Sequence, residues 1–390
     1  KIGLFPREMV QYRKNRKRRK IMDFLYCNPN VMLIKNDYEI VVNTQEEGVC
    51  YVKVGRQTFH ENHSGIMPSV TLVHKYVVPQ KLLDKYKTYT VYFKKVVERK
   101  NNFPVVGELL KKTYAFRPIE KTDDINTFYI ADIHTDWDNA EKVSLYFGDK
   151  LDLYIVNGDF GESSSYENLR RLNKLIGNVT KGEIPSLVGR GNHDTRGLLA
   201  EKVTDYMATD DGRAYFEFSA GPLWGVIFDC GEDKYDNHPE YRSLNFFEQY
   251  RKDELNYLKK LKSKAAPFKF AVCHVPFMHD CAMSGQFDIM PDLYKKWGEE
   301  ANRLGFEFMI CGHTHTVRYI PVTGDEGDKF EHNYPVVVGV TKRHGYLSGT
   351  ALTLKKSGSV MRIVGSDGDV SPEFKISEGF AEADGKAIKN

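Results

Sequence analysis

Short apolar runs separated by turn residues dominate the first quarter of the chain. Between about residues 31 and 98 these runs are VMLI, YEIVVN, VCYVKV, SVTLVHKYVV and YTVYFKKVV. They are rich in β-branched and aromatic residues, and apolar and polar positions partly alternate, which is typical of strands rather than helices. The pattern predicts an all-β, immunoglobulin- or fibronectin-like sandwich over residues 29–116. The polar stretch 117–126 contains a proline and is the expected linker.

Beyond residue 126, apolar runs alternate with amphipathic stretches. The runs are TFYIA, LDLYIV, SLV, LWGVIF, FKFAV and FEFMI, and the amphipathic stretches include YENLRRLNKLIG and FFEQYRKDELNYLKKLKS. Alternation of strands and helices predicts a layered α/β domain with helices packed on buried sheets. Further strands follow at PVVVGV, GTALTL and SVMRIV, so the domain is expected over 127–370. Residues 371–390 are polar and are expected to form a loose tail.

Composition narrows the class of protein. Of the 390 residues, 41% are hydrophobic and 13% aromatic, which is ample for a large core and excludes a disordered chain. No apolar run approaches the roughly 18 residues that a membrane-spanning helix needs. The six cysteines contain no C-x-x-C pair, which argues against a disulfide scaffold or a thiolate zinc site. They favour a reducing cytoplasm, with a secreted form as the alternative if a signal segment preceded Lys1.

The charge is concentrated near the start of the chain. Residues 1–28 are expected to form a basic arm, because QYRKNRKRRK at 11–20 carries seven basic side chains and no acidic one. A solvated arm is the simplest interpretation. Contact with nucleic acid or an anionic membrane through Arg13–Lys20 is the weaker alternative. The block has no interleaved aromatic residues, and the sequence shows no known nucleic-acid-binding fold.

The chemistry lies where the apolar runs stop. Five of the predicted buried strands end directly in polar clusters, which are Asp132-Ile133-His134, Gly158-Asp159 with Glu162, Gly191-Asn192-His193-Asp194, Cys273-His274, and Gly312-His313-Thr314-His315. Ligands bind outside the carboxyl ends of strands in open α/β sheets, so five such ends would build one site. Residues i and i+2 of an extended segment point the same way, so D-x-H and H-x-H each supply two ligands to one side.

The convergent groups fit the ligand set of a metal pair. Two aspartates, one asparagine and four histidines offer seven oxygen and nitrogen donors and no thiolate. Seven donors are too many for one tetrahedral ion and fit two ions that share a bridging carboxylate. Carboxylate and imidazole donors favour Mn, Fe or Zn over an iron–sulfur cluster.

The ordered set D-x-H, G-D-x-x-E, G-N-H-D, a single His and G-H-x-H resembles the calcineurin-like metallophosphoesterase family over roughly residues 125–370. The resemblance implies two mixed sheets flanked by helices. The β-rich region before it resembles the fibronectin-type domain of purple-acid-phosphatase-like proteins. The purple enzymes, however, have G-D at the first motif and a metal-bound tyrosine near the second. Here these positions hold Asp132-x-His134 and Glu162, so the ordinary family site is the better match.

The resemblance also implies a role for each residue of the motifs. The first metal would be bound by Asp132, His134 and His315. The second would be bound by Asn192, His274 and His313. Asp159 would bridge the two. His193 would protonate the leaving oxygen, Glu162 would orient His193, and Arg190 would clamp the phosphate. Asp194 is equally well explained as the cap of the following turn.

These inferences lead to one favoured function and two alternatives. The favoured function is a dinuclear-metal-dependent hydrolase of phosphoric esters, in which a metal-bridged hydroxide attacks phosphorus and His193 is the general acid. Phosphomonoesters are slightly favoured, and the substrate is a phosphorylated small molecule or nucleotide. A phosphodiesterase or nuclease is the first alternative. A non-catalytic scaffold on the same fold is the second, and it is disfavoured because no ligand is missing.

Overall fold

A sheet of ten strands runs through the molecule. The computed structural model of the chain describes residues 23–280, 287–383 and 386–388. Residues 11–20 of the predicted basic arm lie outside this range. Nine strands of the large sheet lie side by side in the order β21 (Phe374–Lys375), β20 (Val360–Gly365), β19 (Tyr346–Leu354), β9 (Ile125–Ile130), β10 (Leu153–Asn157), β11 (Pro185–Gly189), β1 (Asn30–Ile34), β2 (Asp37–Asn43) and β5 (Val73–Pro79). The tenth strand, β18 (Lys342–Arg343), pairs with β19.

A second sheet of six strands packs against the first and shares a hydrophobic core with it. Its order is β12 (Phe216–Ala220), β13 (Leu223–Phe228), β14 (Phe268–Cys273), β15 (Phe308–Cys311), β17 (Val336–Val338) and β16 (Arg318–Ile320). Strands β9–β11 are mutually parallel, and so are β13, β14, β15 and β17. Parallel strands buried on both faces are apolar along their length, which is why they appear in the sequence as continuous apolar runs.

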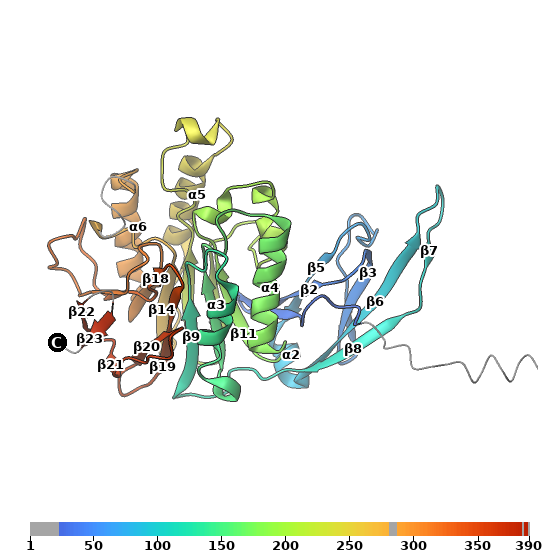
Figure 1. Ribbon diagram of the computed structural model, residues 1–390, viewed down its shortest axis with the longest axis horizontal. Helices are drawn as coiled ribbons and strands as arrows, with labels where there is room; N and C mark the ends of the chain where they lie inside the picture. The colour runs from blue at the N-terminus through green and yellow to red at the C-terminus, as the bar shows by residue number, and fades with distance from the viewer. Residues whose placement is uncertain (1–22, 281–286, 384–385, 389–390) are drawn as a thin grey trace, which may run out of the picture.

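Helices cover the outer faces of these two sheets (Figure 1). Helices α3 (Trp137–Ser144) and α4 (Tyr166–Thr180) contact the strands of the large sheet. Helices α5 (Phe247–Lys260) and α6 (Pro291–Leu304) contribute to a core that lies on the second sheet. Alternate residues of β13 show the layering, because Leu223 and Ile227 belong to the core between the sheets and Trp224 and Val226 to the core under the helices. The predicted layered α/β fold is confirmed.

Four short 3-10 helices also occur in the described residues. They are η1 (Gly148–Lys150), η2 (His193–Thr195), η3 (Ala200–Asp205) and η4 (Pro239–Tyr241). Among the residues that the structure covers, no helix is both long and apolar enough to span a membrane.

The N-terminal region is built from strands, as the alternating pattern predicted, and it also contains one short helix that the pattern did not predict, α2 (Gln80–Tyr86). Its outer layer is a five-stranded sheet of β4 (Gln57–Phe59), β3 (Gly48–Val54), β6 (Thr88–Glu98), β7 (Val105–Val106) and β8 (Leu110–Ala115). Its inner layer consists of β1, β2 and β5, which continue the ten-stranded sheet because β1 pairs in parallel with β11. The large sheet therefore crosses the linker boundary that the sequence suggested at 117–126. The exact domain limits stay predictions.

The end of the chain differs from the expected loose tail. Strand β21 adds to the large sheet, and β22 (Ala381–Ala383) pairs with β23 (Lys386–Ile388). Phe374, Ile376 and Phe380 are buried in the main core, where the ring of Phe380 packs against Phe374 and Tyr319. The segment is polar on average, so its three buried apolar residues gave no clear signal in the sequence. Burial of these three side chains holds the segment on the domain.

Candidate metal centre

The five predicted polar clusters meet at one edge of the two sheets. Strands β9, β10 and β11 are neighbours in the large sheet, and β14 and β15 are neighbours in the second. Each cluster begins within three residues of the end of its strand. Because these parallel strands end at a common edge, side chains far apart in the sequence become neighbours.

All seven predicted ligands lie in this place. Besides a group formed by His134, Glu162 and His193, two groups of donor atoms each fit within 4.8 Å, one from Asp132, His134, Asp159 and His315 and the other from Asp159, His274 and His313. Asp159 belongs to both groups, as a bridging carboxylate must. The seventh predicted ligand, Asn192, joins the second group because its Oδ1 lies 3.1 Å from Nδ1 of His313.

The distances between donor atoms are those of ligands around metal ions. With bonds of about 2.1 Å, neighbouring ligands on one ion lie about 3 Å apart. Nε2 of His134 lies 3.0 Å from Nε2 of His315, which lies 3.4 Å from Oδ1 of Asp132. In the second group, Nε2 of His274 lies 3.2 Å from Oδ2 of Asp159. The same carboxylate oxygen is 3.6 Å from Nε2 of His134, so it faces both groups.

His274 shows why a cation belongs here. Its Nδ1 donates a hydrogen bond to the backbone carbonyl of Asn157, which leaves the Nε2 lone pair free. Nε2 is buried, makes no hydrogen bond and faces carboxylate oxygens. Burial lowers the pKa of His274, but the charges of Asp159 and Asp132 outweigh it and raise this pKa to about 10. The site therefore attracts positive charge strongly, and the oxygen and nitrogen donors fit a pair of transition-metal ions.

The backbone of the site loops is strained in a way that serves the ligands. Non-glycine residues rarely adopt positive φ angles, yet the site loops hold six of them, namely Asp132, His134, Thr135, Asp159, His313 and His315. Each costs on the order of 1 kcal/mol and persists only where the surroundings enforce it. Gly191 permits the closest approach, since a Cβ atom there would lie 2.2 Å from Oδ1 of Asp159.

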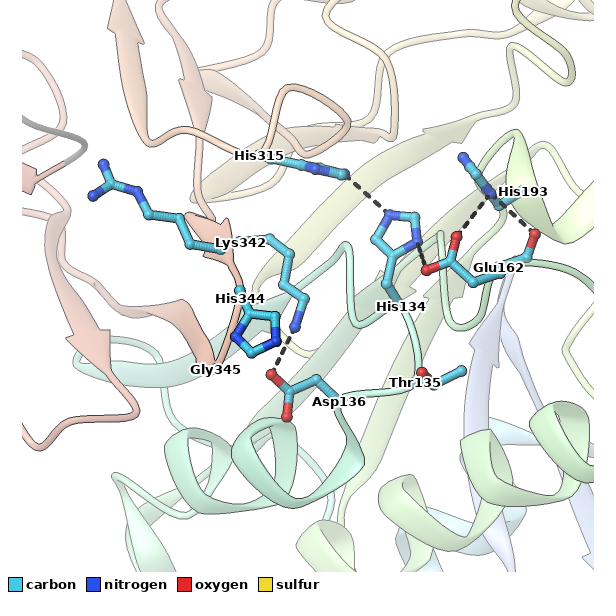
Figure 2. A pocket seen from close by; sticks show the side chains of 10 residues that line it. His134, Thr135, Asp136, Glu162, His193, His315, Lys342, His344 and Gly345 are labelled. Atoms are coloured by element: carbon cyan, nitrogen blue, oxygen red, sulfur yellow. Dashed lines mark hydrogen bonds and ion pairs between the residues drawn. The ribbon is translucent and has the colours of Figure 1, made fainter.

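An open pocket of about 580 Å³ lies over the first group of ligands. Figure 2 shows His134 and His315 on its wall, with His193 and Glu162 on one side and Lys342, His344 and Asp136 on the other. The ring of His193 stands edge-on to that of His134, with centroids 4.8 Å apart. Its Nδ1 donates to the backbone carbonyl of Glu162 at 3.1 Å, while the Glu162 carboxylate is 3.9 Å from the same nitrogen. Glu162 therefore lies beside His193 as predicted, but its backbone carbonyl rather than its carboxylate accepts the hydrogen bond from the ring.

Comparison with known proteins agrees with this geometry. Residues 125–317 match the family model of the calcineurin-like phosphoesterases. The chain therefore contains a domain of that family. The family and the two donor groups together make it a metal-dependent hydrolase of phosphoric esters with a dinuclear metal site.

Two solved structures share the fold of this phosphoesterase. One is a purple acid phosphatase from yellow lupin (Lupinus luteus) seeds, 12% identical, with a TM-score of 0.56, covering 89% of this chain and 73% of the other. The other is PhoD, 10% identical, with a TM-score of 0.52, covering 94% of each chain. Both alignments extend over the N-terminal β region, which agrees with the resemblance seen in the sequence. No curated protein sequence matches the chain.

Arg190 does not line the pocket of the phosphoesterase, contrary to the prediction of a phosphate clamp. Its guanidinium pairs with the fully buried carboxylate of Asp229 at 2.5 Å. The aromatic rings of Phe247 and Tyr250 lie against it, and the Tyr250 hydroxyl donates to the same carboxylate. Because breaking a buried ion pair leaves an unpaired charge, this arginine supports the loop rather than the substrate.

Asp194 has a larger role than the turn cap suggested by the sequence. Its buried carboxylate accepts hydrogen bonds from the backbone N–H groups of Asp159, Phe160 and Gly191. It thereby joins the loop that carries the bridging aspartate to the loop that carries Asn192. Burial and repulsion by Asp159 raise the pKa of Asp194 to about 7.

The sequence motifs missed one wall of the pocket. Lys342, Arg343, His344 and Gly345 line it, and they come from β18 and the turn that joins it to β19. The backbone N–H of Lys342 donates to the carbonyl of His315, which ties this turn to the ligand loop. The one feature of the sequence that could have indicated this wall is a run of two basic residues and a histidine before a glycine and a strand. This run belongs to no motif.

Proposed function

We propose that this phosphoesterase hydrolyses phosphoric monoesters, with His193 as the general acid. The proposed metal ligands are Asp132, His134, Asp159, Asn192, His274, His313 and His315. When bound, the metal pair neutralises phosphate charge and lowers the pKa of a bound water, which supplies a hydroxide nucleophile near neutral pH. Manganese, iron and zinc all suit the donor set.

The placement of His193 carries the proposal. The carbonyl of Glu162 can only accept, so Nδ1 of His193 keeps its hydrogen and Nε2 is the atom that exchanges a proton with the substrate. The side chain is 27% exposed and lines the pocket, so it can reach a bound ester. The backbone N–H of His193 donates to Asp159, which fixes the residue relative to the metal ligands.

A monoester fits the charge of the pocket better than a diester. A phosphoric monoester is largely a dianion above its second pKa of about 6, whereas a diester carries one charge. The metal pair, when bound, adds positive charge to a pocket that Arg343 and four histidines also line, and this charge favours the more highly charged phosphate.

Metal content and ester hydrolysis measured together test the proposal. We expect about two transition-metal ions per chain and, with added Mn²⁺, faster hydrolysis of p-nitrophenyl phosphate than of bis-p-nitrophenyl phosphate. His274→Ala should lose metal and activity together. The exposed His63→Ala, in the N-terminal region, should keep both.

His193→Ala separates the acid from the metal ligands. It should keep its metal and lose about 10²–10⁴-fold in kcat, with a larger loss for phenyl phosphate than for p-nitrophenyl phosphate, because poor leaving groups need the proton most. Equal losses on both esters would contradict the role of His193. A preference for the diester would contradict the monoester assignment and favour the phosphodiesterase alternative.

A further inference from the structure

The N-terminal region exposes a group of apolar side chains on one hairpin. The β6–β7 hairpin, residues 96–109, consists of the end of β6, a turn, β7 and the segment that leads to β8. Its end projects beyond the rest of the N-terminal region (Figure 1). Phe103 in the turn is 84% exposed, and Val97, Val105, Val106 and Leu109 are exposed as well. Single exposed apolar residues are ordinary, but a group of them marks an interaction surface.

Strand pairing keeps the valines of this hairpin together. Val96 pairs with Val106 and Glu98 with Val105, so Val97 is the extra residue of a β-bulge. Gly107 lies beside Val97, since a Cβ atom added to this glycine would be 3.8 Å from Cγ2 of the valine. Paired strands are about 5 Å apart, so the exposed valines lie within one narrow ribbon.

A neighbouring loop extends the apolar surface. Ile66 and Val70 are exposed in this loop. Arg99, at the start of the hairpin turn, donates hydrogen bonds to the hydroxyl and the carbonyl of Ser69. The same guanidinium pairs with Glu47 at 2.9 Å. Arg99 therefore holds the loop beside the hairpin, and the apolar residues of both belong to one end of the N-terminal region.

Two lysines place positive charge next to this surface. Lys94 and Lys111 are exposed, and among the described residues no acid lies within ion-pair distance of either. Lys111 pairs with Tyr92, which precedes Lys94 by two residues on β6. Residues i and i+2 of a strand face the same way, so both ammonium groups lie on one face of the sheet.

The basic block of the sequence joins the fold at the base of the same hairpin. Asp23, the first residue that the structure describes, pairs with Lys112 at 2.7 Å and lines one cavity with Gly107 and Leu110. The block at 11–20 has seven basic side chains and no acidic one, and it ends three residues before Asp23. Its charge is therefore attached next to the apolar surface.

This combination of side chains fits an anionic lipid surface best. Aliphatic side chains gain nothing from the phosphates of a nucleic acid, whereas at a bilayer they leave water for the boundary of the acyl chains. A stable protein interface buries about 800 Å² on each partner and needs a broad complementary surface, which a projecting ribbon does not offer. Apolar insertion and a basic segment are the two signals that together bind a protein to a membrane.

We propose that the β6–β7 hairpin docks the protein on an anionic lipid membrane. Phe103 and the exposed valines enter the boundary between headgroups and acyl chains. Lys94, Lys111 and the basic block at 11–20 contact the negative headgroups. None of these residues belongs to the metal centre, so this inference is independent of the proposed hydrolysis.

Cosedimentation of the full chain with lipid vesicles tests the proposal. The vesicles consist of phosphatidylcholine alone or of phosphatidylcholine with about 30% phosphatidylserine. We expect binding to the anionic vesicles to be at least about tenfold tighter than to the neutral ones. It should weaken as salt is raised from about 0.05 to about 0.5 M, because salt screens the attraction between exposed charges.

Variants of the hairpin show whether it makes the contact. Phe103→Ser should weaken binding to anionic vesicles about tenfold, because the ring that leaves water is lost. Its melting temperature and its hydrolysis of p-nitrophenyl phosphate should not change, since the side chain is exposed. The matched control is Phe246→Ser, at a phenylalanine that is 75% exposed before α5, and it should bind like wild type. Lys94→Glu combined with Lys111→Glu should weaken binding to the anionic vesicles only.

Three results would overturn the proposal. The first is a full chain that does not bind anionic vesicles, or a Phe103→Ser variant that binds them as wild type does. The second is a dimer in sedimentation velocity that Phe103→Ser dissociates, without vesicle binding, which would assign the hairpin to a second copy of the chain. The third is binding of a single-stranded oligonucleotide in place of vesicles, unaffected by Phe103→Ser, which would assign the basic block to nucleic acid.

Discussion

Replacing Asp194 with asparagine should loosen the metal centre without touching a proposed ligand. Oδ2 of Asp194 accepts from the N–H groups of Asp159 and Gly191 at 2.8 and 2.9 Å, and Oδ1 accepts from Phe160 at 3.1 Å. The asparagine side chain has nearly the same shape but only one oxygen. Its NH₂ group must therefore face at least one backbone N–H donor inside the protein.

The three hydrogen bonds set the size of the effect. If the asparagine oxygen keeps the two bonds of Oδ2, the N–H of Phe160 loses its acceptor while buried, which costs about 1–3 kcal/mol. The two remaining bonds change from charge-assisted to neutral, which costs about 0.5–1 kcal/mol each. The lost hydrogen bonds together would cost about 2–5 kcal/mol of unfolding free energy. Removing the charge also relieves its burial and its repulsion by Asp159, so the net loss of stability in Asp194→Asn should be smaller than this. Affinity for Mn²⁺ should fall about 10–100-fold, because the loops of Asp159 and Asn192 are no longer joined firmly.

Urea unfolding of the metal-free protein measures the first effect, and calorimetric titration with Mn²⁺ measures the second. Both are done at pH 8.5, above the pKa of about 7 that burial and Asp159 give to Asp194, so that the wild-type carboxylate is ionised. The control is Asp211→Asn, since Asp211 is exposed and its φ of 55° suits asparagine. If Asp194→Asn binds Mn²⁺ as tightly as the control variant, the carboxylate does not hold the loops together.

Two predictions concern stability away from the site. Burial lowers the pKa of His74 to about 4, from 6.5. On acidification the unfolded chain takes up this proton first, so between pH 7.5 and 4 wild type should lose about 3 kcal/mol of unfolding free energy more than His74→Gln in urea titrations. Equal pH dependence would contradict the buried neutral state. Phe380→Ala should lower stability by about 3 kcal/mol because its ring is 5% exposed, whereas Val370→Ala, at a side chain 43% exposed, should cost under about 0.5 kcal/mol. Similar melting temperatures for these two variants would contradict the packing of residues 371–390 on the domain and favour the loose tail expected from the sequence.

The sequence could predict the metal centre because its information is local. Each proposed ligand follows an apolar strand within a few residues, so Asp132 and His274 are recognisable without knowledge of the fold. Parallel strands bring their carboxyl ends to one edge by geometry alone. The layered α/β class is similarly local, since the periodicity of each segment shows it.

Contacts between distant segments could not be predicted. Arg190 stands next to Gly191 in the chain, but its charge partner Asp229 lies 39 residues further on. Strand β1 pairs with β11 and places Val31 beside Pro185. The sequence of neither strand identifies the other as its partner. The hairpin at Lys342 is joined to the ligand loop by a backbone hydrogen bond from Lys342 to His315, and any residue except proline could donate it.

What the sequence could and could not predict corresponds to two parts of the site, the strand ends that carry the proposed ligands and the hairpin that lines the pocket. Proposed ligands sit on strand ends whose backbones are fixed by two sheets, and the strained φ angles of Asp159 and His313 are tolerable only because those sheets and Asp194 hold the loops. Such positions allow few changes, so their residue types reveal their chemistry. The hairpin at 342–345 holds no proposed ligand, and Arg343, His344 and Gly345 are exposed there, so these residues can vary without disturbing the metal centre. Substrate preference is therefore expected to reside in the hairpin, and bond cleavage in the strand ends.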